Sequence, residues 1–268
     1  MNYTQNDLFW AFLMTVIAGL STGVGSAIAF FAKKTNTRFL AISLGFSAGV
    51  MIYVSMIEIF IKARESLIMA MGEKKGNVMT VAAFFGGMLL IGLIDRLIPK
   101  EQNPHEVVNI DQPKKRNVSQ LKRTGLFTAL AVGIHNFPEG IATFVSALQE
   151  PSIAIPIVTA IAIHNIPEGI AVSVPIYYAT GSKKKAFFYS FASGLSEPLG
   201  AIIGYLILIP FMNDAMYGFL FAAVAGIMVF ISLDELLPSA QAYGEHHFSI
   251  YGLVGGMAVM AISLLLFI

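Results

Sequence analysis

Apolar stretches of helix length, separated by short polar interruptions, follow one another along the whole chain. A bilayer core about 30 Å thick is crossed by roughly 20 apolar residues of α-helix. Eight stretches are long enough, and they lie near residues 8–32, 38–61, 78–98, 124–148, 152–178, 186–209, 214–239 and 248–268. The pattern predicts an all-α integral membrane protein with eight transmembrane helices.

The composition is typical of a membrane protein and argues against several classes of function. The chain has 268 residues, of which 56% are hydrophobic and 12% charged, and its mean hydropathy is +0.72. A net charge of +1 argues against a nucleic-acid partner, which would need a basic surface. The absence of cysteine excludes disulfides, thiolate metal sites and cysteine nucleophiles.

Lysine and arginine gather on one side of the predicted membrane. The loops that follow the odd-numbered spans contain Lys33, Lys34, Arg38, Lys100, Lys114, Lys115, Arg116, Lys122, Arg123, Lys183, Lys184 and Lys185. Because basic loops stay in the cytoplasm, we expect both termini on the outer side of the cell (inner) membrane. We expect residues 1–268 to form a single transmembrane domain, with a flexible cytoplasmic loop at about 99–123.

Two pairs of similar segments indicate an internal repeat. AVGIHNFPEGIATF (131–144) resembles AIAIHNIPEGIAVS (160–173), and AGVMIYVSMIEI (48–59) resembles AGIMVFISLDEL (225–236). In each pair one copy lies in an even-numbered span and the other in an odd-numbered span, so the copies cross the membrane in opposite directions. This arrangement predicts inverted repeats, with spans 1–3 related to spans 6–8 and spans 4 and 5 at the centre.

The HNFPEG and HNIPEG motifs place the same polar groups on one face of two helices. Positions i and i+4 share a helix face, which puts His135 beside Glu139 and His164 beside Glu168. The proline inside each motif removes one helical hydrogen bond and is expected to kink the span. The glycine that follows each glutamate is expected to let the two spans pack closely.

Depth in the membrane brings further groups to the level of the motifs. At a rise of about 1.5 Å per residue, Glu197 of the sixth span lies near the bilayer midplane with the motif histidines and the amides of Asn136 and Asn165. A carboxylate at that depth is a functional-site hypothesis by default. Imidazole together with carboxylate favours zinc and its first-row neighbours over calcium or magnesium. The alternative is a set of hydrogen-bonded core histidines, protonated carboxylates and amides that bridge helices.

Acidic residues also lie near the two membrane faces, where a cation would enter and leave the protein. Glu58 falls near the outer face in the second span, and Asp234 and Glu235 fall near the cytoplasmic face in the seventh. These acids are either entrance and exit groups for a cation or solvated helix ends. Met51 is a candidate sulfur ligand for a softer metal.

The tandem motifs, the eight spans, the outward termini and the loop between spans three and four resemble the ZIP (Zrt/Irt-like) family of divalent-metal transporters, specifically its bacterial ZupT-type branch. The resemblance covers essentially the whole chain. It implies two adjacent metal sites, namely a primary site of His135, Glu139, His164 and Glu168 and a second site of Asn136, Asn165 and Glu197 bridged by both motif glutamates. It further implies a homodimer in many members and an elevator-like displacement of the bundle that carries the site. A histidine-rich loop, common in the family, is missing between spans three and four, which puts loop-based metal sensing in doubt.

Together these inferences predict a transporter, not an enzyme. It would import zinc and other divalent transition metals (iron, manganese, cobalt, cadmium) by alternating access, with one or two ions bound at the central site as substrate and not as cofactor. One alternative is a proton or sodium antiporter that uses the buried carboxylates. Another is an intramembrane metal-dependent hydrolase, but HExxH enzymes have a glutamate where this chain has Asn136 and Asn165.

Overall fold

The computed structural model describes residues 3–31, 37–96, 118–149, 151–243 and 246–266. Within these ranges the chain forms helices and short connections and contains no β-strand, as the sequence predicts. The elements are α1 (Gln5–Phe31), α2 (Thr37–Val54), η1 (Ser55–Ile59), α3 (Phe60–Met71), α4 (Glu73–Arg96), α5 (Val118–Gln149), α6 (Pro151–Thr180), α7 (Lys183–Gly194), α8 (Ser196–Ile203), η3 (Gly204–Leu208), η4 (Ile209–Phe211), α9 (Asp214–Ile231), η5 (Ser232–Leu236), α10 (Leu237–Tyr243) and α11 (His246–Leu266).

Seven helical segments of the described chain are long and apolar enough to cross a membrane, which indicates a multi-pass membrane protein. They are Gln5–Ile28, Arg38–Met71, Glu73–Arg96, Ile155–Val174, Lys183–Leu208, Asp214–Gln241 and His246–Leu266. Each of the seven overlaps a predicted span, but Arg38–Met71 ends ten residues beyond the boundary predicted at residue 61. The remaining predicted span, 124–148, coincides with helix α5 but is not among the seven, so the count of eight stays a prediction.

Helix α5 begins before the expected end of the preceding loop. The loop was expected to continue to residue 123, whereas the helix already covers residues 118–123. This segment, VSQLKR, contains glutamine, leucine, lysine and arginine, which all favour helix. The part of the loop at 97–117 lies outside the described residues.

Departures from α-helical geometry occur in the acidic segments of the second repeat pair. The segments SMIEI and SLDEL form π-helical turns, η1 and η5, in which the backbone N–H of Phe60 bonds to the carbonyl of Ser55 and that of Leu237 bonds to the carbonyl of Ser232. By contrast, α5 and α6 run without interruption through Pro138 and the proline of the second motif. A third π-turn, η3, follows α8, whereas η1 and η5 occupy equivalent positions in the two copies of the repeat. Each holds an extra residue in its turn and so rotates the acid that it carries relative to the preceding helix.

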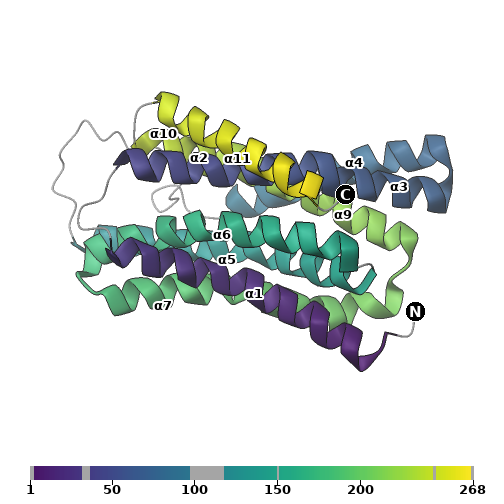
Figure 1. Cartoon of the computed structure of the whole chain (residues 1–268), viewed down its shortest axis with the longest axis horizontal. Helices are drawn as coiled ribbons and strands as arrows, with labels where there is room; N and C mark the ends of the chain where they lie inside the picture. The colour runs from purple at the N-terminus through teal and green to yellow at the C-terminus, as the bar shows by residue number, and fades with distance from the viewer. Residues whose placement is uncertain (1–2, 32–36, 97–117, 150, 244–245, 267–268) are drawn as a thin grey trace.

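The helices group into two bundles, which form the two layers of Figure 1. We call α1, α5, α6, α7, α8 and η3 the site bundle; α2, η1, α3, α4, α9, η5, α10 and α11 form the second bundle. Across the boundary between them, α2 packs against α6 and α5 packs against α9. Buried apolar side chains from both bundles make one continuous core.

Glycines hold the helices of each bundle at close range. In the site bundle, a Cβ on Gly25 of α1 would lie 1.9 Å from the Ile166 carbonyl oxygen of α6. In the second bundle, a Cβ on Gly226 of α9 would lie 1.9 Å from the Phe84 carbonyl oxygen of α4. For every described glycine that has a neighbour within 4 Å, the nearest atoms belong to its own bundle. Backbones therefore touch within the bundles, while side chains separate the bundles from each other.

Candidate metal site

The motif glycines place the candidate site by drawing two other helices against the motif helices. A Cβ on Gly140 of α5 would lie 2.1 Å from the Glu197 carbonyl oxygen of α8, and a Cβ on Gly169 of α6 would lie 1.9 Å from the Thr22 carbonyl oxygen of α1. The expectation that these glycines pack the two motif helices onto each other is therefore wrong. Because only glycine fits at Gly140, the backbone of Glu197 lies directly beside the first motif.

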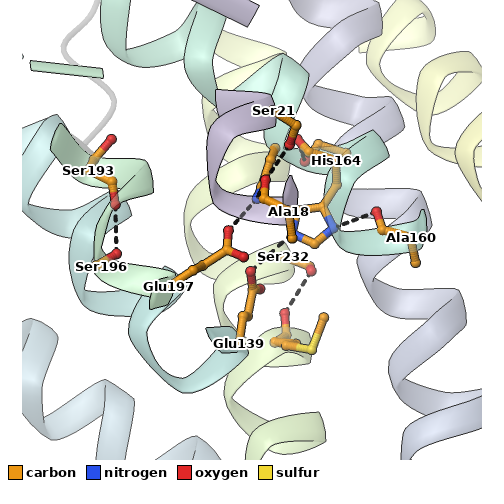
Figure 2. Close-up of polar contacts among 12 residues, drawn as sticks. Ala18, Ser21, Glu139, Ala160, His164, Ser193, Ser196, Glu197 and Ser232 are labelled. Atoms are coloured by element: carbon orange, nitrogen blue, oxygen red, sulfur yellow. Dashed lines mark hydrogen bonds and ion pairs between the residues drawn. The ribbon is translucent and has the colours of Figure 1, made fainter. Parts of the chain in front are cut away.

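His164 is held in a defined orientation by both of its ring nitrogens. Nδ1 lies 3.0 Å from the Ala160 carbonyl oxygen, and Nε2 lies 3.1 Å from Oε2 of Glu139 (Figure 2). A carbonyl oxygen only accepts hydrogen bonds, so Nδ1 carries a proton and donates it. In the neutral ring the lone pair is then on Nε2, the atom that faces the carboxylate. This is the arrangement found in metal-binding histidines, whose other nitrogen donates to a backbone carbonyl or carboxylate.

Asn165, the next residue of α6, connects three helices. Its Nδ2 donates one hydrogen bond of 2.9 Å to the Ala18 carbonyl oxygen of α1 and another to Oε1 of Glu197 in α8. Glu139 of α5 and Glu197 of α8 thus contact neighbouring positions of α6 (Figure 2). The structure therefore brings residues of the first and second motifs together with the glutamate of α8.

Burial leaves part of this polar cluster without hydrogen-bond partners in the described protein. Glu139 is 1% exposed, and His164, Asn165, Glu168 and Glu197 are fully buried. Oε1 of Glu139 and Oδ1 of Asn165 are buried and accept no hydrogen bond from the described residues. A buried oxygen without a partner costs about 1–3 kcal/mol. These two oxygens are therefore suited to a cation or an ordered water.

The remaining predicted ligands are Glu168, Asn136 and His135. Glu168 and Asn136 are buried in α6 and α5, and each has an interaction partner in the protein. The side chain of His135 lies outside the described residues, although its backbone is part of α5. Among the described side chains, no three His, Asp or Glu residues gather closely enough to hold a metal ion. The complete predicted ligand sets therefore stay a prediction.

The predicted path residues lie in the second bundle. Met51 of α2 is fully buried, and Glu235 of η5 is 7% exposed. Glu58 of η1 is partly exposed, and Asp234 of η5 is exposed. The two acidic turns therefore hold carboxylates at different levels of burial.

Two hydroxyl groups near the site were missed by sequence reasoning. Ser47 of α2 is fully buried and donates a hydrogen bond of 3.2 Å to the His164 carbonyl oxygen. Thr143 is fully buried one turn after Glu139 on the same face of α5, and its Oγ1 has no hydrogen-bond partner in the described protein. The only sequence signal was a hydroxyl group within an apolar span, which is also common in ordinary helix packing.

Comparisons with known proteins agree with the motifs. A family model described as "ZIP Zinc transporter" matches residues 97–264. The chain is 67% identical over 264 residues to the zinc transporter ZupT of Streptococcus mutans, a match that covers 98% of this chain and 100% of that protein. It is 63% identical over 279 residues to zinc transporter ZupT of Clostridium perfringens and 64% identical over 266 residues to that of Oceanobacillus iheyensis. Those matches cover 98% of this chain in both cases, and 98% and 99% of the two relatives.

Proposed function

This chain belongs to the ZIP zinc transporter family, and we propose from that premise that it carries zinc across the cell membrane into the cytoplasm. Zinc is the substrate of this process and not a resident cofactor. The proposal includes iron, manganese, cobalt and cadmium as further substrates, because a site of imidazole, carboxylate and amide groups also accepts these ions. Family membership favours a transporter over the antiporter and hydrolase alternatives.

The contact between His164 and Glu139 carries the proposal. Two ligand atoms bound to a tetrahedral zinc ion at about 2.1 Å lie about 3.4 Å from each other. The separation of 3.1 Å between Nε2 and Oε2 is close to that value, and both atoms have lone pairs available when the ring is neutral. A small outward shift of either side chain admits the ion between them. The ion then replaces the direct contact as the partner of both groups.

We assign the remaining ligands as the sequence predicts. His135 and Glu168 complete the primary site, while Asn136, Asn165 and Glu197 form a second site beside it. The orphaned oxygens of Glu139 and Asn165 support this assignment, because each is buried and has an unused acceptor position. One or two ions then occupy the cluster at a time.

The two bundles supply a physical basis for alternating access. Glycine contacts fix the helices inside each bundle, whereas α2 with α6 and α5 with α9 meet through side chains. We therefore propose that the site bundle moves as one body past the second bundle and takes the ion with it. Glu58 attracts the ion at the outer end, and Asp234 and Glu235 receive it at the cytoplasmic end.

Matching features support the inverted repeat and a fold of eight spans. Gly140 and Gly169 occupy the same position in the two motifs, and each packs against the backbone of a helix of its own bundle, α8 and α1 respectively. Gly49 and Gly226 likewise occupy the same position in the second repeat pair and pack against α11 and α4. These pairs follow the expected exchange of spans 1–3 with spans 6–8. The outward termini, the single domain over 1–268 and a homodimer are part of the same proposal.

Zinc uptake into proteoliposomes tests the proposed function. The purified chain is expected to load vesicles with zinc down a gradient, and Glu139→Ala is expected to reduce the rate by at least about hundredfold. Zinc-induced thermal stabilisation of the purified protein, lost in the same variant, separates failed binding from failed movement. Uptake that continues unchanged in Glu139→Ala contradicts the assignment of the site.

A further inference from the structure

Ser47 connects the two bundles at the candidate metal site. It belongs to α2 of the second bundle and is fully buried, and its hydroxyl donates a hydrogen bond of 3.2 Å to the carbonyl oxygen of His164 in α6. The ring of the same histidine contacts Glu139. One residue of α6 is therefore bonded through its backbone to the second bundle and through its side chain to the site bundle.

The position of Ser47 on α2 follows from the glycines around it. Gly45 and Gly49 face α11, because a Cβ on either would lie within 2.2 Å of a backbone oxygen of Ser249 or Leu253. Ser47 is two residues from both glycines and so lies about 200° around the helix from each. The helix packing that joins α2 to α11 thus turns the hydroxyl of Ser47 toward α6.

The hydrogen bond of Ser47 differs from those of the other buried hydroxyl groups in the described structure, because it joins the two bundles. Most of the others donate to a carbonyl three or four residues earlier in their own segment. Ser26 and Ser190 also donate to another helix, but their acceptor is the Gly169 carbonyl oxygen, inside the site bundle. The counterpart of Ser47 in the repeat is Val224 of α9, which has no hydroxyl group. The donor is thus present in only one copy of the repeat.

We propose that Ser47 is a positioning residue that latches the site bundle to the second bundle in the arrangement seen here. The inference rests on the proposed movement of the bundles. A hydrogen bond weakens steeply beyond about 3.5 Å, so α6 cannot slide along α2 by even one helical turn without breaking it. The bond therefore favours this arrangement, and breaking it is part of the step that leaves it. Because the acceptor is a backbone oxygen, loss of the hydroxyl leaves every proposed ligand atom in place.

The distance between the bundles can be measured with spin labels on introduced cysteines, because the chain contains no cysteine of its own. Spin labels are attached to Phe188→Cys in α7 and Tyr251→Cys in α11, two exposed positions that report the distance between the bundles. The distance distribution is recorded in lipid with and without zinc, and zinc uptake is measured for the same variants. The test variants are Ser47→Ala and Ser47→Thr, and Ser146→Ala is the control because its buried hydroxyl bonds only within α5.

Ser47→Ala is expected to move the ratio of the two distance populations about fivefold away from the latched arrangement and to change the maximal uptake rate by up to that factor. Ser47→Thr, which keeps the hydroxyl, and Ser146→Ala are expected to resemble the parent chain. Unchanged populations and uptake in Ser47→Ala overturn the latch while the transport function stands. If Ser47→Ala and Ser47→Thr shift the ratio of the distance populations equally, the hydroxyl group is not the cause of the shift, and the latch is overturned. Absence of zinc uptake by the parent chain instead refutes the proposed function on which the latch rests.

Discussion

The site bundle buries the polar residues Glu139, His164, Asn165 and Glu197 at the contacts of α1, α5, α6 and α8, whereas the second bundle buries mainly apolar side chains at the contacts of α2, α4, α9 and α11. The mode of helix packing is the same in both, because glycines bring the backbones together in each. The packing mode therefore does not create the candidate site. The site requires, in addition, polar residues at the positions that the glycines bring close.

The second bundle places its acids differently. The acids of its predicted ion path lie in the π-turns η1 and η5, and Asp234 is exposed while Glu235 is buried. Glu139 and Glu197, by contrast, lie in α-helical segments and face the interior of their bundle. The difference suits a division of roles in which the site bundle holds the ion and the second bundle provides carboxylates along the path of the ion. Each of the following predictions tests one part of this division.

Substitution of the packing glycines should have the largest effect and should be equal in the two bundles. Gly25→Ala and Gly226→Ala each place a methyl group 1.9 Å from a backbone oxygen, so the helices must separate. We expect each to lower the free energy of unfolding by about 3 kcal/mol or more, which corresponds to a melting temperature lower by about 10 °C in detergent. Gly86→Ala is the control, because no atom lies within 4 Å of its added Cβ. Tolerance of Gly226→Ala alone contradicts the similarity of the two bundles.

Removal of the motif histidines should have the next largest effect and should be confined to the site bundle. His135→Ala and His164→Ala are each expected to reduce zinc uptake by about hundredfold, because each removes one ligand from the same ion. His247→Ala in α11 is the control, because the His247 ring is exposed in the second bundle. This substitution is expected to leave zinc uptake within about twofold of the parent rate. A strong difference between the two motif variants indicates that the second site, around Glu197, makes the two half-sites unequal.

Substitution of the acids in the π-turns η1 and η5 should have smaller effects, which appear in the kinetics of zinc uptake. Glu58→Gln and Glu235→Gln remove charge along the proposed path but leave the ligands intact, so we expect the zinc concentration at half-maximal uptake to rise about three- to tenfold. The effect of Glu58→Gln should weaken as salt is added, because the residue is partly exposed and its field is screened. Vesicle uptake measured at two salt concentrations checks both points. A loss as large as that of the histidine variants places the acid among the ligands and contradicts the division of roles.

The helices and the motif cluster were predictable from the sequence because both depend on local patterns. Apolar stretches of about 20 residues mark most of the spans, and the spacing of His164 and Glu168 fixes their common helix face. The junction of Glu139 with His164 followed from the repetition of one polar motif in two neighbouring spans. The family assignment was confirmed as well, since the tandem motif is specific.

The contacts between helices that are distant in the sequence were not predictable in the same way. The motif glycines were expected to pack against each other, yet Gly140 packs against α8 and Gly169 against α1. A single sequence states that a small residue is present but not which helix approaches it. The π-turns and the contact of Ser47 with α6 depend in the same manner on the tertiary arrangement, and only the repeated segments SMIEI and SLDEL hinted at the turns.

Substitution of the serines that begin η1 and η5 should have the smallest effects. The two substitutions should change the melting temperature in different directions. Oγ of Ser55 is buried without a hydrogen-bond partner in the described chain, whereas Oγ of Ser232 donates a bond of 2.7 Å to the Met228 carbonyl oxygen. Ser55→Ala removes an unsatisfied group and is expected to leave the melting temperature unchanged or slightly higher. Ser232→Ala removes a bond within one helical segment and is expected to cost about 0.6 kcal/mol, or roughly 2 °C. A larger loss in Ser55→Ala shows that its hydroxyl has a partner outside the protein, such as an ordered water or the ion itself, and extends the path into the second bundle.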